Sequence, residues 1–311
     1  MDRNSVDWHG QVTALVTPFD VEGNINEKAL RHQVEFVIAN GIHGIVADGC
    51  TGEFWSQTLD ERRRVVRIVT EQARGRVRVI GNASWNYTRD VIELTRYYKQ
   101  IGCDGVMIMP PFMVRPNKED IFHHFKAVSD AVKLPILLYN VPHDTVNDLT
   151  PELVDRLADL ECVVAIKDSS FDFNIFWKLQ CMVSERIRVL IGPSTLFGAP
   201  AIQMGAEGWV DTYSNLWPQL TVELYHEAKK GISPRVIELQ KRGTELRRFL
   251  LRDGWNMYCA IKAAMNLRGL PGGYPRPPLR PLGEADLAIM REGLDRLGVP
   301  HATLPLEAAA D

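Results

Sequence analysis

Lys167 is the residue in this sequence whose position best suits covalent chemistry. It ends the run Cys162-Val-Val-Ala-Ile-Lys167, an apolar, β-branched stretch that predicts a buried parallel strand. Burial disfavours the ammonium form of a lysine and lowers its pKa, which makes the neutral amine more accessible. That amine can condense with a carbonyl compound to form a Schiff base. A lysine at a strand end is more often solvated or salt-bridged, so its neighbours must distinguish the two interpretations.

Two further groups would share the same end of a sheet with Lys167 if the strands are parallel. Tyr139 ends the preceding expected strand, and its phenol could move protons near the amine, although a buried tyrosine that only caps a core is also common. The glycines around Cys50 and Thr51 could aim backbone amides at a carboxylate, although they could equally form an ordinary turn. The presence of an amine, a phenol and an anion-binding loop on one rim favours catalysis.

Short β-branched runs alternate with longer amphipathic stretches along most of the chain. The expected strands are 12–16, 44–47, 77–81, 106–109, 136–139, 163–166, 189–191 and 209–211. The expected helices are 27–39, 59–73, 91–101, 118–131, 151–157, 174–182, 196–204 and 218–230. This alternation predicts an α/β protein with a closed (β/α)8 TIM barrel. A doubly wound sheet is disfavoured, because Thr17-Pro-Phe-Asp-Val-Glu-Gly23 follows the first strand where a glycine-rich phosphate loop would be needed.

The alternation stops near residue 231. Three more helices are expected with no strand between them, at 234–252, 257–268 and 284–297. We therefore predict a barrel over residues 8–231 and a C-terminal helical region over residues 232–311. Helix starts are expected where Pro follows Thr150 and at two capping-box patterns that begin at Thr58 and Asn117.

Composition narrows the function classes. The chain has 311 residues, of which 45% are hydrophobic and 24% charged, with a net charge of -3, so there is no basic surplus for nucleic acid. The arginines at 62–64 are expected on the solvated face of a helix. No apolar run suits a membrane span, and the N-terminus lacks the apolar core of a signal peptide. The five cysteines are scattered without a CxxC pair, so we expect neither zinc nor disulfides, and a cytoplasmic location.

The sequence resembles the dihydrodipicolinate synthase / N-acetylneuraminate lyase superfamily of class I aldolases. The matching segments, in order, are Ala14-Leu-Val-Thr-Pro-Phe19, Gly49-Cys-Thr-Gly-Glu53, Tyr139-Asn-Val-Pro142, Ile166-Lys167-Asp168 and Arg276-Pro-Pro-Leu-Arg-Pro-Leu282. The resemblance spans nearly the whole chain. It implies a homodimer or a homotetramer.

The resemblance also implies roles for single residues. Lys167 would form an imine with the ketone of a small-molecule 2-oxo acid, usually pyruvate or a pyruvate-derived skeleton, and Tyr139 would pass protons. Cys50, Thr51 and Gly52 would hold the carboxylate beside the ketone. Because the protonated imine is itself the electron sink, no metal or organic cofactor is implied.

Three replacements depart from the pattern of the synthases. Cys50 stands where Ser or Thr is common, and a thiol is a weaker hydrogen-bond donor, so the proton relay could run through Thr51 or water. Met113 stands where a relay tyrosine reaches the neighbouring subunit. Asp144 stands where an arginine binds the second substrate's carboxylate, and an aspartate would repel it. These replacements count against the dihydrodipicolinate synthase reaction itself.

Other positions near the strand ends are also unusual. Trp85 and Trp209 could line the pocket, or they could pack at a subunit interface. Asp144, Asp211 and His143 are candidate contacts for a polyol or an amine.

The sequence therefore predicts a Schiff-base lyase, with an aldolase slightly favoured over a dehydratase of 2-oxo-3-deoxy sugar acids. One alternative is a catalytically silent protein of the same fold that binds a small acid or has a regulatory role. A metal-dependent lyase is disfavoured, because His123 and His124 fall on an expected helix and not at strand ends.

Overall fold

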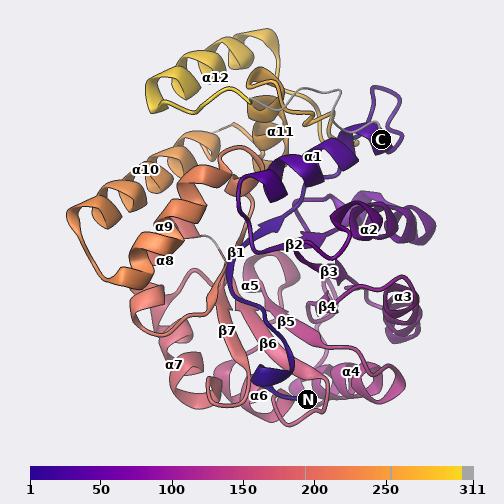
Figure 1. Ribbon diagram of the computed structural model, residues 1–311. Coiled ribbons are helices and arrows are strands. Elements are labelled where there is room, and N and C mark those ends of the chain that lie inside the picture. Colours follow the sequence, from indigo (N-terminus) through magenta and orange to yellow (C-terminus); the bar gives the residue numbers. More distant parts are fainter. Residues whose placement is uncertain (193, 253, 303–311) are drawn as a thin grey trace.

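Eight parallel strands close into a barrel that is surrounded by helices (Figure 1). The computed structural model describes residues 1–192, 194–252 and 254–302. The strands are β1 (Gly10–Ala14), β2 (Gly44–Ala47), β3 (Arg78–Asn82), β4 (Gly105–Ile108), β5 (Ile136–Asn140), β6 (Val163–Asp168), β7 (Arg188–Ile191) and β8 (Gly208–Asp211). Each strand pairs with the next, and β8 pairs with β1. The predicted TIM barrel is confirmed.

Helices follow each strand and continue beyond the barrel. The α-helices are α1 (Glu27–Ala39), α2 (Leu59–Ala73), α3 (Thr88–Gln100), α4 (Lys118–Ala131), α5 (Pro142–Thr145), α6 (Pro151–Leu157), α7 (Phe173–Val183), α8 (Ser194–Gln203), α9 (Pro218–Lys230), α10 (Pro234–Leu250), α11 (Met257–Leu267) and α12 (Glu284–Leu297). The 3₁₀ helices are η1 (Arg3–Ser5), η2 (Phe54–Ser56) and η3 (Tyr213–Asn215). The expected starts at Thr58, Asn117 and Thr150 are confirmed, since each side chain accepts a backbone N–H of its helix.

The first strand begins two residues earlier than its apolar pattern suggested. It includes Gln11, whose side chain is buried and donates to the Ser214 hydroxyl at 2.9 Å. Buried polar groups of this kind are tolerated because they are hydrogen-bonded. A prediction based on runs of apolar residues therefore misses the start of β1.

The core has two layers that the barrel wall separates. Inside the barrel, apolar side chains such as Val12, Leu137 and Leu190 fill the space between strands. Trp8 is buried with them, beside β4. Outside, the apolar faces of the helices pack against the outward side chains of the strands. The inner layer leaves a large open space near the carboxyl ends of the strands, where functional residues of a TIM barrel gather.

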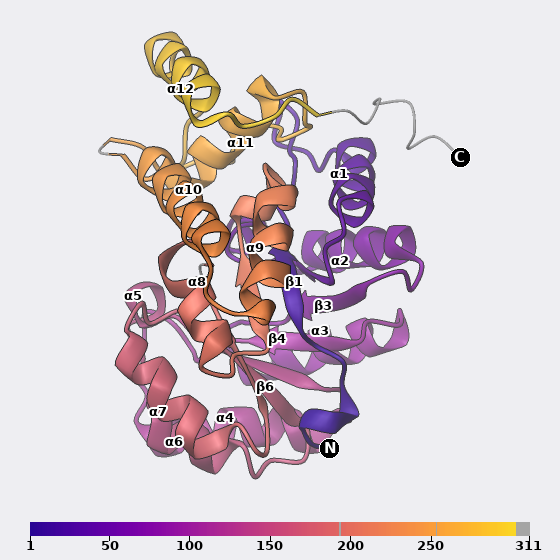
Figure 2. The same ribbon diagram turned by 60° about the vertical axis from the view of Figure 1, so that its left-hand side comes forward.

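The C-terminal helices cover one end of the molecule. Figures 1 and 2 both place α11 and α12 at the end opposite η1. Helix α10 is fixed to α8, where Gln240 donates to the Ser194 carbonyl at 3.0 Å and Thr244 to the Thr195 carbonyl at 2.8 Å. The division into a barrel and a C-terminal region at residue 232 stays a prediction, and residues 303–311 lie outside the described residues.

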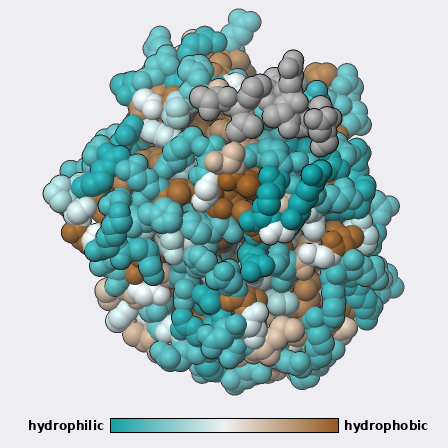
Figure 3. All heavy atoms as spheres, viewed as in Figure 1, coloured by the Kyte–Doolittle hydropathy of each residue, from teal (hydrophilic) through white to brown (hydrophobic). Residues whose placement is uncertain are grey.

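The face shown in Figure 3 is mainly hydrophilic, with apolar side chains in small separate patches. Within the described residues, none of the helices combines the length and the apolar character that a membrane crossing requires.

Candidate active site

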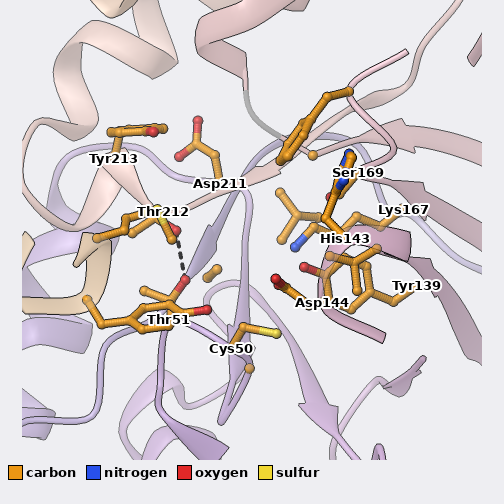
Figure 4. Close-up of a pocket in the computed structure, with 18 of the residues that line it drawn as sticks. Cys50, Thr51, Tyr139, His143, Asp144, Lys167, Ser169, Asp211, Thr212 and Tyr213 are labelled. Atoms are coloured by element: carbon orange, nitrogen blue, oxygen red, sulfur yellow. Dashed lines mark hydrogen bonds between the residues drawn. The ribbon is translucent and has the colours of Figure 1, made fainter. Parts of the chain in front are cut away.

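A cavity of about 310 Å³ opens at the carboxyl ends of the strands (Figure 4). Residues from the ends of β5, β6 and β8 form its walls, together with the loop after β2. Of the eight residues that the sequence singled out for the site, seven line this cavity, namely Cys50, Thr51, Tyr139, His143, Asp144, Lys167 and Asp211.

Lys167 and Tyr139 are direct neighbours across two strands. They are paired residues in the register of β5 and β6, so both side chains point to the inside of the barrel. The amino nitrogen of Lys167 lies 4.0 Å from the centre of the Tyr139 ring, and Lys167 is only 6% exposed. Burial lowers the pKa of Lys167 to about 8, against an opposing effect from nearby acidic groups. The amine is therefore far easier to deprotonate than an ordinary lysine.

Both weak acids beside Lys167 keep their protons at neutral pH. Burial raises the pKa of the Tyr139 phenol well above its usual value, and the neighbouring Cys50 raises it further. Burial also raises the pKa of the Cys50 thiol to about 11. Figure 4 shows the Cys50 sulfur directed toward the side of the cavity that holds Tyr139 and Asp144. The two groups can donate protons to a ligand but are poor bases.

Two carboxylates face the cavity, and they are held differently. Asp211 accepts hydrogen bonds from the Ser194 hydroxyl and from the Ser214 amide, the latter at 3.2 Å. Asp144 lies on the short helix α5, and its side chain extends toward Lys167 in Figure 4. Burial raises the pKa of both carboxyls, and both favour the charged form of Lys167. Asp211 is thus a fixed charge, whereas Asp144 is the carboxylate that a ligand can reach.

Buried ion pairs hold both ends of the loop that carries Cys50 and Thr51. Asp48 accepts from the Arg62 guanidinium at 2.7 Å, and Glu53 pairs with Lys262 from α11. Asp48 and Glu53 both have a positive φ, near 60°, a backbone conformation that residues other than glycine rarely adopt. The expectation that Arg62 lies on a solvated face was wrong, because Arg62 is fully buried and also donates to two carbonyls of the β3 end.

The loop presents polar groups to the cavity. In the described part of the structure, the backbone amides of Cys50 and Thr51 have no hydrogen-bond acceptor. The Thr51 hydroxyl lies 2.7 Å from the Thr212 hydroxyl, and Figure 4 shows the two residues together on the side of the cavity away from Tyr139. Gly52 does not line the cavity, and its amide donates to the Gly49 carbonyl at 2.9 Å. A ligand carboxylate could therefore bind the first two amides, but not Gly52 as expected.

Comparison with known proteins agrees with this arrangement. Residues 7–295 match the model of the dihydrodipicolinate synthetase family. The 4-hydroxy-tetrahydrodipicolinate synthase of Methanopyrus kandleri is 34% identical over 293 residues, which cover 93% of this chain and 96% of that protein. The chain belongs to the dihydrodipicolinate synthetase family. The resemblance drawn from the sequence motifs and the assignment to lyases are thereby confirmed.

Solved structures of this family have the same fold. Dihydrodipicolinate synthase from Aquifex aeolicus matches with a TM-score of 0.88 at 28% identity, over 95% of this chain and 100% of that one. The chloride-inhibited synthase from Acinetobacter baumannii, solved in complex with pyruvate, matches with a TM-score of 0.87 at 29% identity, over 94% of this chain and 99% of that one.

Trp85 and Trp209 were candidates for the wall of the pocket, but neither residue lines the cavity. Trp209 is fully buried in the outer core layer, where its ring meets Tyr225 edge-on and its indole N–H donates to Gln11. Trp85 packs against Phe54 and Phe112. The interpretation of Trp209 as a pocket or interface residue was wrong, because the side chains of a strand alternate and Trp209 points away from the barrel axis.

Several cavity residues were not anticipated from the sequence. Ser169, Thr212 and Tyr213 follow strand ends, and the rule that such positions carry function could have indicated them. The wall formed by α10 and the start of α11 had no such signal. It consists of Arg247, Leu251, Met257 and Tyr258.

Metal ligation finds no support among the described side chains. No group of three or more His, Cys, Asp or Glu residues in that part of the chain is placed to hold a metal ion. His123 and His124 lie on α4, as expected.

Proposed function

We propose that this chain is a Schiff-base-forming lyase in which Lys167 attacks the ketone of a 2-oxo acid. The observation that carries the proposal is the buried amine of Lys167, with a pKa of about 8, over the ring of Tyr139. At pH 7 about a tenth of such an amine is neutral, whereas a lysine of ordinary pKa has only a few neutral molecules in ten thousand. The site therefore supplies the nucleophile that the reaction requires.

The surrounding groups suit the remaining steps. The amides of Cys50 and Thr51 would bind the carboxylate beside the ketone and so orient its carbonyl carbon toward Lys167. Attack of the amine gives a carbinolamine, and protonation of its hydroxyl lets water leave and the imine form. Tyr139 is the donor in reach, because its phenol keeps its proton at neutral pH.

The imine then allows a carbon–carbon bond to break. When the C4 hydroxyl of a bound 4-hydroxy-2-oxo acid loses its proton to a base, the bond between C3 and C4 cleaves and C4 leaves as an aldehyde. The electron pair of the broken bond moves into the protonated imine and gives an enamine. Protonation at C3 and hydrolysis return the 2-oxo acid and free Lys167. Loss of a hydroxyl as water from the same imine is the second choice, so we favour an aldolase over a dehydratase.

We further propose that the second substrate or tail differs from that of the named relatives. Asp144 stands at the cavity mouth where the resemblance implies an arginine in the synthases, and a carboxylate there disfavours an incoming anion. His143 and Ser169 add polar groups to the lining of the same cavity. These residues suit a hydroxyl or an amine on the middle of the substrate.

Borohydride trapping tests the mechanism. Incubation with pyruvate and borohydride should reduce the imine and add the mass of the reduced pyruvate adduct to the peptide that contains Lys167. The Lys167→Ala variant should gain no mass, whereas Lys178→Ala, a change of an exposed lysine on α7, should label like the unchanged protein. Binding of pyruvate without labelling of Lys167 would contradict the proposal. It would favour the alternative of a catalytically silent protein that binds a small acid.

We also propose that the chain forms a homodimer or a homotetramer. Met113, Val114 and Val146 are exposed, Met113 by 83%, and Asn147 ties their two loops together by donating to the Val114 carbonyl at 2.8 Å. An exposed apolar group beside the site supports self-association. Light scattering after size-exclusion chromatography would distinguish a dimer or tetramer from a monomer, the state named for one structural relative of this family.

A further inference from the structure

The far wall of the cavity comes from the C-terminal helices and not from the barrel. Leu251 follows α10, and Met257 and Tyr258 begin α11. These residues are apolar or aromatic, and the only charged side chain that they share the wall with is Arg247, on the last turn of α10. The wall that the C-terminal helices contribute therefore carries one positive charge in largely apolar surroundings.

Arg247 is held in place by neutral groups. Its guanidinium carbon lies 5.8 Å from the centre of the Phe171 ring, within the range of a cation–π contact. Its charge also acts against the burial that raises the pKa of Tyr213, so the guanidinium is close to that phenol. Among the described residues, no carboxylate forms an ion pair with Arg247, whereas Arg235 on the same helix pairs with Glu223 and Glu238.

The two carboxylates of the cavity have contacts other than Arg247. Asp211 is fixed by Ser194 and Ser214, and Asp144 faces Lys167. Neither carboxylate therefore needs Arg247 as its partner. A guanidinium that is half-buried presents a planar set of donors, which matches a carboxylate with two parallel hydrogen bonds.

The size of the cavity leaves room for a longer substrate than pyruvate. Its volume of about 310 Å³ equals that of roughly ten water molecules in the liquid. Pyruvate bound as an imine at Lys167 would fill only part of this space. Arg247 lines the same cavity as Lys167, so the remaining space is open to a group that Arg247 could bind.

We propose that Arg247 binds a second carboxylate, so that the substrates are dicarboxylic 2-oxo acids. This inference rests on the proposed imine chemistry at Lys167 and adds the recognition of the substrate's far end. A phosphate ester carries a charge near −2 and would meet a single cation together with the repulsion of Asp144 and Asp211. A carboxylate matches one guanidinium in both charge and shape.

The test compares acids that differ only in the charge at the far end. The probes are 2-oxoglutarate and 2-oxoadipate, and the neutral isosteres that carry an isopropyl group in place of the second carboxylate. For each acid, the half-saturating concentration for borohydride trapping on Lys167 is measured. We expect at least one dicarboxylate to saturate roughly 10- to 100-fold lower than its isostere.

Three variants assign this preference to Arg247. Arg247→Met should abolish the preference, and Arg247→Lys should keep part of it, since an ammonium retains the charge but not the planar fork. Arg248→Met is the matched control, because Arg248 is the next residue of α10 but is exposed and lines an outer crevice. It should keep the full preference.

Each outcome bears on one of the two proposals. Equal saturation by dicarboxylates and isosteres, or an unchanged preference in Arg247→Met, would overturn the role of Arg247 while pyruvate trapping still supports the imine chemistry. Absence of trapping with every acid, pyruvate included, would instead overturn the proposed function. Trapping of pyruvate by Arg247→Met shows that this variant is folded and that its selectivity can be judged.

Discussion

The amine of Lys167 lies over the face of the Tyr139 ring. The distance from the nitrogen to the ring centre is 4.0 Å, and the two residues are paired across β5 and β6. The ring face attracts the ammonium form, while burial opposes it. The ring therefore positions the amine, and the phenol remains available for proton transfer to a bound ligand.

Replacement of Tyr139 by phenylalanine should separate these two roles. Tyr139→Phe keeps the ring under the amine but removes the proton donor. We expect imine formation with pyruvate to slow by roughly 10²- to 10⁴-fold, with little change in the free energy of unfolding. Single-turnover trapping would measure the rate, and Tyr87→Phe, at an exposed tyrosine outside the cavity, is the control. An unchanged rate in Tyr139→Phe would contradict the assignment of the phenol.

The rate of imine formation should follow the ionisation of Lys167. Only the neutral amine attacks, and its pKa is lowered to about 8. The trapping rate at limiting pyruvate should therefore rise with pH, reach half its maximum near pH 8, and level off above it. A rate that still rises steeply at pH 10 would show that Lys167 ionises like an ordinary lysine.

Asp144 should set part of that pH dependence. Its carboxylate favours the ammonium form of Lys167, so Asp144→Asn should lower the pKa of the amine. The profile should move to lower pH, and trapping of pyruvate at pH 7 should be faster by roughly two- to fivefold. Asp60→Asn removes the same charge at an exposed site remote from the cavity and should leave the profile in place. A shift toward higher pH would exclude a direct effect of Asp144.

Burial of Lys167 should lower the free energy of unfolding of the protein at neutral pH. The pKa of Lys167 is about 8 in the folded chain and 10.5 in the unfolded chain, so the unfolded chain binds more protons between these values. The cost of burying the ammonium is full below pH 8 and disappears above pH 10.5. Lys167→Met should therefore raise the free energy of unfolding at pH 7 by roughly 2–4 kcal/mol. Denaturation at pH 7 and pH 10.5 measures the difference, which should shrink at the higher pH.

Local patterns predicted the barrel but not all of the site. The alternation of apolar runs predicted nearly every strand and helix, and even the full bounds of α1 and α4, because those elements have one clear apolar face or buried run. Strand ends then led to Lys167 and Tyr139. The pattern could not show that Arg62 is buried, because its acceptors come from β2 and β3.

The C-terminal wall of the cavity was beyond the reach of the same reasoning. Arg247 lies 80 positions after Lys167 on a helix with an ordinary polar pattern. Only the packing of α10 on α8 brings it to the cavity. The four-residue helix α5, which carries Asp144, was also missed because a single turn has no periodicity to detect.

The ion pair between Lys262 and Glu53 links the C-terminal region to the loop that carries Cys50 and Thr51. Lys262 is 1% exposed and Glu53 is fully buried. Lys262 also donates to the Tyr274 carbonyl at 2.9 Å, and the Arg276 amide donates to Glu53 at 3.1 Å. Each partner of the buried pair therefore also makes a hydrogen bond to the segment after α11.

Lys262→Met should leave the Glu53 carboxylate buried without its cation. Removal of one partner of a buried pair costs about 3–5 kcal/mol, which a denaturation curve would show. The double variant Lys262→Met with Glu53→Gln should recover part of this loss, because neither charge remains. Lys133→Met is the matched control, since it breaks an exposed pair with Glu161 and should change stability by less than about 1 kcal/mol. Because Glu53 ends the loop that carries Cys50, the double variant should still bind pyruvate more weakly than the unchanged protein if the pair positions the loop. Full recovery of stability with unchanged pyruvate saturation would show that the pair stabilises the fold without shaping the site.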